Sequence, residues 1–580
     1  FVAFDKFHSR RGVNPSLFTV PTAQMRAGDF SQLGADPFLY DPTSTTCSGG
    51  TCTRTPFQGM KNGVPTYNVI PDSYLSPISQ KMQSFLPDPS NDALVNNDFG
   101  GAPSGFDNHV IDWRVDYDVS AKQRISTIGA MGSVKYVNNY GTPFLPLPYT
   151  GGDLAQISPK VFDVEDTYTF SPRLVNQLKY GYTRFFQNIQ NATQGITQYE
   201  AGTMGITNLP AGQAGEEFPG AAFGATGKYA AAAPTTQWTS NSNAASTQLT
   251  TPNNYALVDN LQWTKGRHAI TLGISIQWQQ INNANPATYT GVLSLAYNPY
   301  STANFSGNAL TTNTGYSYAS YLLGAVGGTP SIGLQPISEL GGRYRPIAPY
   351  IEDSFKVNSK LTLSLGLRWD YLPPYREVKD HWTFMNPDLT NAITGTPGML
   401  QFAGNYGGPG VSCGCRTPVK TYWENWGPRI GLAYSVNDKT VIRAGFATVY
   451  SQGGGVGGRG GAFQGTGQTG FNMTATGPDE ITSGAAANPS FYLNNGPYFT
   501  SIGQANTSLF GAGYAYPSAP TPGVAAQVLN TGNYLNSSGK FVTANSVAYA
   551  DPYYSGRAPQ FTFYNFGFER AIPPDMTLGV

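Results

Sequence analysis

Charged residues make up only 12% of this 580-residue sequence, about half their usual share in soluble domains, whereas aromatic residues reach 13%. Lys plus Arg and Asp plus Glu are equal at 34 each, so there is no basic excess of the kind that binds nucleic acid. No run of about 18 apolar residues occurs, which excludes a helical membrane span but leaves open crossing by shorter alternating strands.

The first segment, 1–107, is predicted to hold little regular structure. A possible strand at 1–7 leads into a long polar loop. Within this loop Ser76 and Pro77 precede an apolar stretch that stops at Pro87, which predicts a short amphipathic helix with Ser76 as its N-cap.

Between 108 and 450 several stretches alternate apolar and polar residues with the period of two that a β-strand requires: 108–119, 270–278, 361–370, 428–436 and 441–446. One set is predicted to face lipid: Ile111, Val115, Ile274, Leu363, Leu365 and Ile442. The other is predicted to face the lumen: Asp112, Arg114, Asp116, Arg368, Asp370 and Arg443. Aromatic residues near the strand ends are predicted to form interfacial girdles, with core packing as the alternative: Trp113, Trp263, Trp278, Trp369 and Tyr450.

Short turns alternate with long connections along the chain. The turns lie at 120–122, 171–173, 264–267, 358–360, 437–439 and 572–575. The long connections are 139–162, 188–254, 282–348, 372–426 and 451–560. This contrast is typical of outer-membrane barrels, although a soluble antiparallel sheet with one solvated face also alternates.

We therefore expect an all-β fold, an antiparallel up-and-down transmembrane β-barrel with long extracellular loops. Two strands per turn, with the strand at 1–7, give 12–13 strands, against roughly 22 in barrels with a plugged lumen. The barrel is therefore expected to be partial, the chain being cut at both ends. Its single domain, 1–580, divides into an early strand and loop (1–107), five hairpins (108–450), a Gly-rich loop (451–560) and a truncated hairpin (561–580).

Five segments resemble the barrel region of Oar-like TonB-dependent receptors, the type that often carries an N-terminal carboxypeptidase-regulatory-like domain. They are 20–31, 259–268, 350–370, 425–434 and 565–575, in family order. The resemblance implies a bacterial outer-membrane receptor that takes up a large or scarce solute, such as a carbohydrate, a peptide or a metal chelate. Its implied partners are TonB and outer-membrane lipid. The family's plug, TonB-contacting segment and regulatory-like domain are not recognisable here, so transport would belong to the parent protein.

The four cysteines form two close pairs. Cys47 and Cys52 enclose a flexible Ser-Gly-Gly-Thr spacer, which predicts a loop disulfide in an oxidising compartment. Cys413 and Cys415 are separated by Gly414 alone, a spacing that favours an unpaired or strained pair.

Catalytic motifs are absent or weak. Residues 453–458 fit GxGxxG, but the Gly-rich run continues to 470, so no helix follows to hold a pyrophosphate. No HExxH, Walker or GxSxG motif occurs. We expect no enzyme activity, no cofactor and no metal site; a secreted β-rich adhesin or glycan-active protein is the alternative function.

Overall fold

The computed structural model describes most of the chain. The residues outside the description are 13–15, 101–103, 140–144, 150–151, 192, 194, 207–217, 235–247, 285–293, 329–330, 335–338, 391–396, 406–411, 452–472, 477–479, 496–499, 502–533, 536–540, 543–550, 552–555, 573–575 and 580. The predicted GxGxxG loop and most of the turn at 572–575 fall in these ranges.

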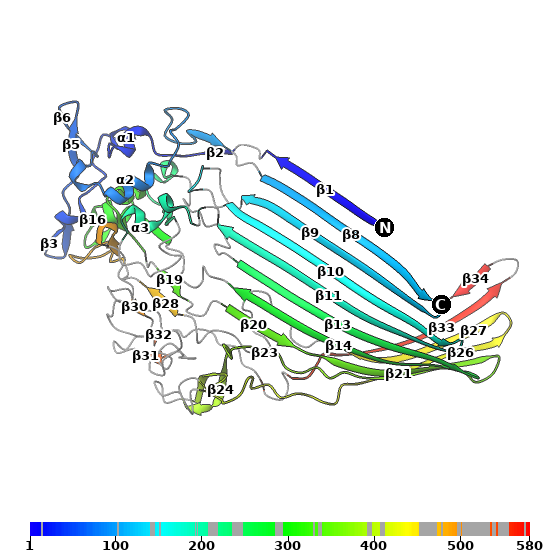
Figure 1. Cartoon of the computed structure of the whole chain (residues 1–580). Helices are drawn as coiled ribbons and strands as arrows, with labels where there is room; N and C mark the ends of the chain where they lie inside the picture. Colours follow the sequence, from blue (N-terminus) through cyan, green and yellow to red (C-terminus); the bar gives the residue numbers. More distant parts are fainter. Residues whose placement is uncertain are drawn as a thin grey trace.

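One large antiparallel sheet dominates the molecule (Figure 1). Its strands are β1 (Val2–Arg11), β8 (Ser104–Ser120), β9 (Gln123–Asn139), β10 (Gly152–Ser171), β11 (Leu174–Asn191), β13 (Gln248–Lys265), β14 (His268–Ala284), β21 (Ile347–Lys356), β22 (Leu361–Trp369), β26 (Trp426–Asn437), β27 (Thr440–Tyr450), β33 (Gln560–Ile572) and β34 (Met576–Gly579). Each pairs with the next in this order, which confirms the predicted meander. Two short strands, β20 (Glu339–Tyr344) and β23 (Arg376–Glu377), extend the sheet beside β14.

The sheet curls, so that β26, β27 and β33 pass behind the front strands in Figure 1. Within the part of the chain that the structure describes, β1 and β34 each have one strand neighbour, so the sheet is an open path. The thirteen strands of this path agree with the count from the sequence.

The expected loop boundaries are wrong at several strands. The predicted connections 139–162 and 188–254 are too wide, because β10 already begins at Gly152 and β11 continues to Asn191. The first part of β10 carries polar Gln156 and Ser158 at positions where the alternation requires apolar residues. The pattern in the sequence therefore does not show where this strand begins. Strands of 17–20 residues therefore extend past the length that crosses a bilayer.

The connections at the end opposite the tight turns fold together into one body, here called the cap: residues 16–100, 145–149, 196–206, 218–233, 295–328 and 480–495 (Figure 1, left). Its helices are α1 (Ala23–Arg26), α2 (Pro77–Gln83), α3 (Ala201–Met204) and α6 (Ser317–Leu322). Its short strands are β2 (Ser16–Phe18), β3 (Thr46–Ser48), β4 (Thr51–Thr53), β5 (Gln58–Lys61), β6 (Val64–Tyr67), β7 (Asp98–Gly100), β12 (Gly220–Phe223), β15 (Ser294–Tyr297), β16 (Phe305–Ser306), β17 (Ala309–Leu310), β18 (Ala325–Val326) and β29 (Phe491–Tyr492). Further short strands outside the cap are β19 (Ser331–Leu334), β24 (Thr383–Thr390), β25 (Pro397–Phe402), β28 (Met473–Thr476), β30 (Thr500–Ser501), β31 (Tyr534–Leu535) and β32 (Phe541–Val542).

A tyrosine-rich core holds the cap together. The predicted helix is confirmed as α2, and the Ser76 hydroxyl accepts the Ser79 N–H at its start. The Tyr321 hydroxyl, fully buried, donates to the Ser79 carbonyl at 2.9 Å, and the Tyr318 hydroxyl donates to the Gln83 side chain. Phenol groups bury a large apolar area yet keep a hydrogen bond, so these contacts tie α6 to α2.

A buried arginine links two further cap segments. Arg54 is 5% exposed, and its guanidinium donates to the carbonyls of Tyr300 at 3.1 Å, Ala303 at 3.0 Å and Ala487 at 3.3 Å. A buried cation needs such partners, because leaving it unpaired is costly.

In the described residues no helix is both long and apolar enough to cross a membrane.

Candidate functional site: the polar face of the sheet

Cross-strand register separates the two faces of the sheet. Cα partners share a face, and the pairing puts Asp112, Arg114, Asp116, Arg368 and Arg443 together on what we call the polar face. The opposite, apolar face carries Ile111, Val115, Ile274, Leu363, Leu365 and Ile442. Asp370 lies just past β22 and accepts a hydrogen bond from Arg368 Nε at 2.8 Å.

Near the tight turns the polar face carries a charge cluster on β8 and β9. The Asp116 carboxylate accepts hydrogen bonds from Arg114 Nε at 2.9 Å and from the Ser126 hydroxyl at 2.7 Å. Arg124 Nη2 lies 3.3 Å from the same carboxylate. The sequence predicted Arg114 and Asp116 for this face, but it did not identify Arg124 or Ser126 as their partners.

A second cluster follows on β10 and β11. Glu165 pairs with Lys179 Nζ at 2.9 Å and also accepts hydrogen bonds from Gln177 and from Thr167. Sequence reasoning missed all four residues. The alternation of β10 and β11 would have placed them on the polar face, since each occupies the polar phase of its strand.

Farther along the sheet an aromatic ring joins the polar groups. The Tyr350 hydroxyl donates to the Asn260 side chain, and the Arg368 guanidinium lies 5.7 Å from the centre of the Tyr350 ring. Gly273 lies beneath that ring, where a Cβ would be 2.2 Å from Tyr350 Cζ.

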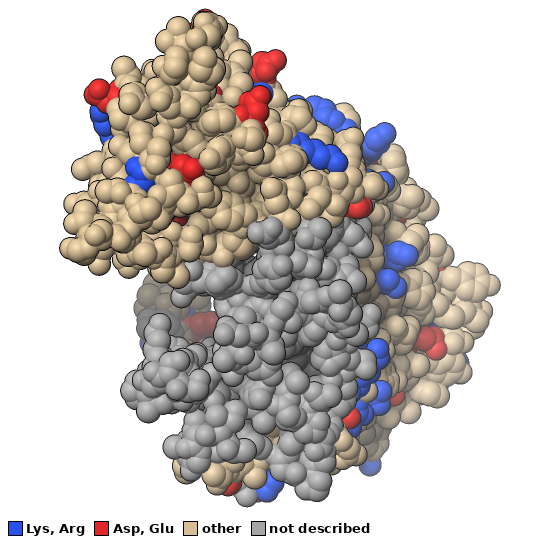
Figure 2. Space-filling view, turned by 90° about the vertical axis from the view of Figure 1, so that its left-hand side faces the viewer, with Lys and Arg blue, Asp and Glu red and all other residues tan. Residues whose placement is uncertain are grey.

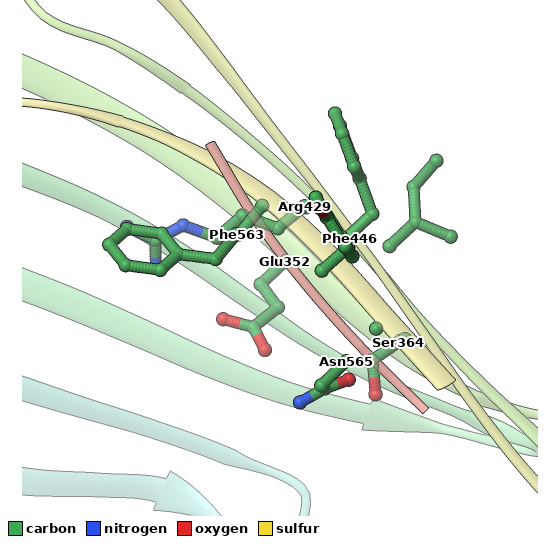
Figure 3. Close-up of a pocket in the computed structure, with 12 residues that line it drawn as sticks. Glu352, Ser364, Arg429, Phe446, Phe563 and Asn565 are labelled. Atoms are coloured by element: carbon green, nitrogen blue, oxygen red, sulfur yellow. The ribbon is translucent and has the colours of Figure 1, made fainter. Parts of the chain in front are cut away.

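A hollow of about 420 Å³ lies across β21, β22, β26, β27 and β33 (Figure 3). Glu352, Arg429 and Phe563 point to one side of the strands there, whereas Phe446 points to the other. Small residues make room for it: Gly366, Gly431, Gly445 and Ala447. On the polar face the hollow therefore presents the Glu352 carboxylate, the Arg429 guanidinium and the Phe563 ring.

The two cysteine pairs lie away from this face. Cys47 and Cys52 form a disulfide between β3 and β4 in the cap. Cys413 and Cys415 are also joined by a disulfide. The expectation that they are unpaired is therefore wrong. Gly414 adopts a φ of +63°, which turns the chain back and leaves the two Cα atoms 5.1 Å apart. Among the described residues no group of His, Cys, Asp and Glu is arranged to hold a metal ion.

Comparison with known proteins gives one family and several distant structures. The model of the outer membrane beta barrel domain matches residues 1–580. A search of curated proteins finds no significant match. Two solved structures of Pseudomonas aeruginosa are similar: a ferric enterobactin receptor (PfeA) mutant, 11% identical with TM-score 0.28, and the siderophore receptor PirA, 9% identical with TM-score 0.31. The alcaligin outer membrane receptor FauA of Bordetella pertussis is 9% identical with TM-score 0.31.

The chain spans a third to a half of these proteins. The matches cover 61%, 82% and 83% of this chain but 34%, 46% and 54% of PfeA, PirA and FauA.

Proposed function

The chain belongs to the outer membrane β-barrel domain family, and from this we propose that it forms barrel wall in a TonB-dependent receptor of the Oar-like type. The protein is located in the outer membrane. The proposed receptor takes up a large or scarce solute, which we place among carbohydrates, peptides and metal chelates.

One observation carries this proposal. The tight turns that the structure describes lie at one end of a single antiparallel meander, and described parts of the long connections fold into the cap at the other end. A solute receptor needs this asymmetry, because its outer loops meet the solute while its inner turns only reverse the chain. The polar face, with its clusters around Asp116 and Glu165, supplies a hydrated inner surface.

The resemblance to Oar-like receptors supports the TonB dependence. Two of the resembling segments, 259–268 and 350–370, form the β13–β14 turn region and the β21–β22 hairpin of the sheet. We assign no catalytic step, cofactor or metal to the chain, and its partners in this proposal are TonB, outer-membrane lipid and the solute.

Uptake in intact cells tests the proposal. A strain that lacks the gene is compared with its parent for uptake of labelled oligosaccharides, peptides and metal chelates. We expect one class to enter only the parent, and that uptake to stop when TonB is deleted or an uncoupler is added. Uptake that survives the loss of TonB would contradict the proposed energy coupling.

The secreted adhesin or glycan-active protein is not favoured, since the described strands form one meander in place of two stacked sheets. Electrophoretic mobility separates the two functions. A folded barrel resists detergent and migrates faster before boiling, so identical mobility of boiled and unboiled full-length protein would favour the secreted alternative.

A further inference from the structure

A band of cations crosses the apolar face on the cap side. It consists of Lys6 on β1, Lys135 on β9, Lys160 on β10 and Arg184 on β11, here called the basic band. Register puts them on the apolar face: Lys6 opposes His109, which shares its face of β8 with Ile111, and Lys160 opposes Met131. Figure 2, seen from the cap, shows Lys and Arg side chains spaced down the flank of the molecule.

The members of the basic band stand at nearly the same height above the tight turns. Lys160 and Arg184 are direct partners, and Lys6 pairs with His109 on β8. The stretches of strand between the band and the nearest tight turn are alike in length: 109–120 on β8, 123–135 on β9, 160–171 on β10 and 174–184 on β11. Because a tilted strand crosses a bilayer in about 9–11 residues, the band lies where the strands leave the membrane on the cap side.

Aromatic side chains lie just below the basic band. Phe162 and Tyr182 are the next residues of the same face on the turn side of Lys160 and Arg184. Pairing continues this row from one strand to the next, through Trp113, Phe162, Tyr182, Tyr255 and Trp278. Tyr and Trp favour the boundary between hydrocarbon and headgroups, which puts the cations level with the headgroups.

No described carboxylate neutralises this charge. Lys160 and Arg184 are direct cross-strand partners, and like charges in that position repel. None of the four cations forms an ion pair with another described residue. Asp107 opposes Lys135 in register, but Arg10, at 2.9 Å, and His8 hold its carboxylate.

We propose that the basic band binds the phosphate groups of an anionic lipid in the outer leaflet. Lysine and arginine bind phosphate by charge-assisted hydrogen bonds, and an anion between Lys160 and Arg184 removes their repulsion. Because the aromatic row lies below the cations on the same face, the ligand must carry apolar chains as well as phosphate. A membrane lipid meets both requirements, and this inference depends on membrane location but not on solute uptake.

Binding to a matched lipid pair tests the proposal. The full-length protein in mixed micelles is titrated with dioleoyl phosphatidic acid, which carries a phosphate monoester, and with dioleoylglycerol, which lacks it. We expect saturable binding of phosphatidic acid only, weakened by roughly tenfold or more in Lys160→Gln/Arg184→Gln, since each charge-assisted contact is worth about a factor of ten. The control Lys122→Gln/Arg173→Gln removes the same charge at two tight turns and should bind as the unaltered protein does.

Further measurements decide the remaining outcomes. The exchange Lys160→Arg/Arg184→Lys keeps both charges and should retain binding even if the neutral variant fails to fold; loss of binding in a folded exchange variant would overturn the assignment. Equal binding by the folded neutral variant, or equal binding of dioleoylglycerol, would also overturn it. Competition by inorganic phosphate as strong as that by the lipid would identify a site for free phosphate and contradict a lipid site.

Discussion

Glu480 is a partly buried acid that joins two cap segments. Its carboxylate accepts hydrogen bonds from the Asn298 side chain and from the Gly328 N–H at 3.1 Å. Burial raises the pKa of Glu480 above its usual 4.5, and the hydrogen bonds and the charge of Arg54 only partly oppose this effect. The folded cap therefore binds a proton at Glu480 more readily than the unfolded chain does.

The pH dependence of cap stability follows from this shift. A raised carboxyl pKa gives stability that is complete below about 4.5 and is lost as the pH rises through the folded value. We expect the urea midpoint of the cap to rise from pH 8 to pH 5, and this rise to shrink in Glu480→Gln. The midpoint is read from brief hydrogen-exchange pulses at one fixed pH, and an unchanged rise in the variant would contradict the assignment to Glu480.

The Trp113 ring packs directly on Gly129 and leaves no room for a side chain there. A Cβ on Gly129 would lie 2.0 Å from Trp113 Cζ2, whereas a Cβ on Gly132 of the same strand would have its nearest neighbours at 3.4 Å. We expect Gly129→Ala to destabilise the sheet by about 1–3 kcal/mol, the usual cost of overpacking, and Gly132→Ala to have a much smaller effect. The temperature at which the fast-migrating folded band disappears measures both, and equal temperatures would refute the close packing of Trp113 on Gly129.

At the scale of the element, the two faces of β22 differ in what they tolerate. Leu365 lies on the apolar face and Ser364 on the polar face, adjacent in sequence. An Arg facing lipid at the midplane costs about 2–4 kcal/mol, so Leu365→Arg should lower the amount of assembled protein in the outer membrane more than Ser364→Arg does. Equal yields of the two variants would mean that the faces are assigned wrongly.

Local sequence rules predicted the strands, the turns and α2. Alternation with period two and a helix cap such as Ser76 act between neighbouring residues, so a single sequence contains them. The cap was not predicted, because contacts such as Tyr321 with Ser79 or Arg54 with Ala487 join residues hundreds of positions apart. The Cys413–Cys415 bond was missed for a local reason, the left-handed turn at Gly414.

The polar face was predicted in outline only. Alternation assigned Arg114, Asp116 and Arg368 to one face, but partners such as Arg124 and Tyr350 depend on which strands lie side by side and in which register. The basic band was missed for the same reason. Lys6 and Lys160 are far apart in the sequence, and only the order β1, β8, β9, β10 brings them onto one surface.

At the scale of the whole molecule, the two ends of the sheet must lie on opposite sides of the outer membrane. Val64 lies in the β5–β6 hairpin of the cap, and its side chain is 61% exposed. Asp438 is exposed in the β26–β27 turn, at the opposite end of the sheet. The four cysteines of residues 1–580 are in disulfides, so within this part of the protein a single added cysteine reports its own position to a thiol reagent.

We expect Val64→Cys in the full-length protein to react with a membrane-impermeant maleimide on intact cells, and Asp438→Cys to react only after the outer membrane is permeabilised. The physical reason is the length of the connections. Outer-membrane barrels have short periplasmic turns and longer extracellular loops. The turns between β8 and β9 and between β26 and β27 are two residues each, whereas the connections at the other end are long enough to fold into the cap. The opposite labelling pattern would invert the orientation and would move the basic band to the inner leaflet. Labelling of both positions on intact cells would show that the sheet does not span the membrane.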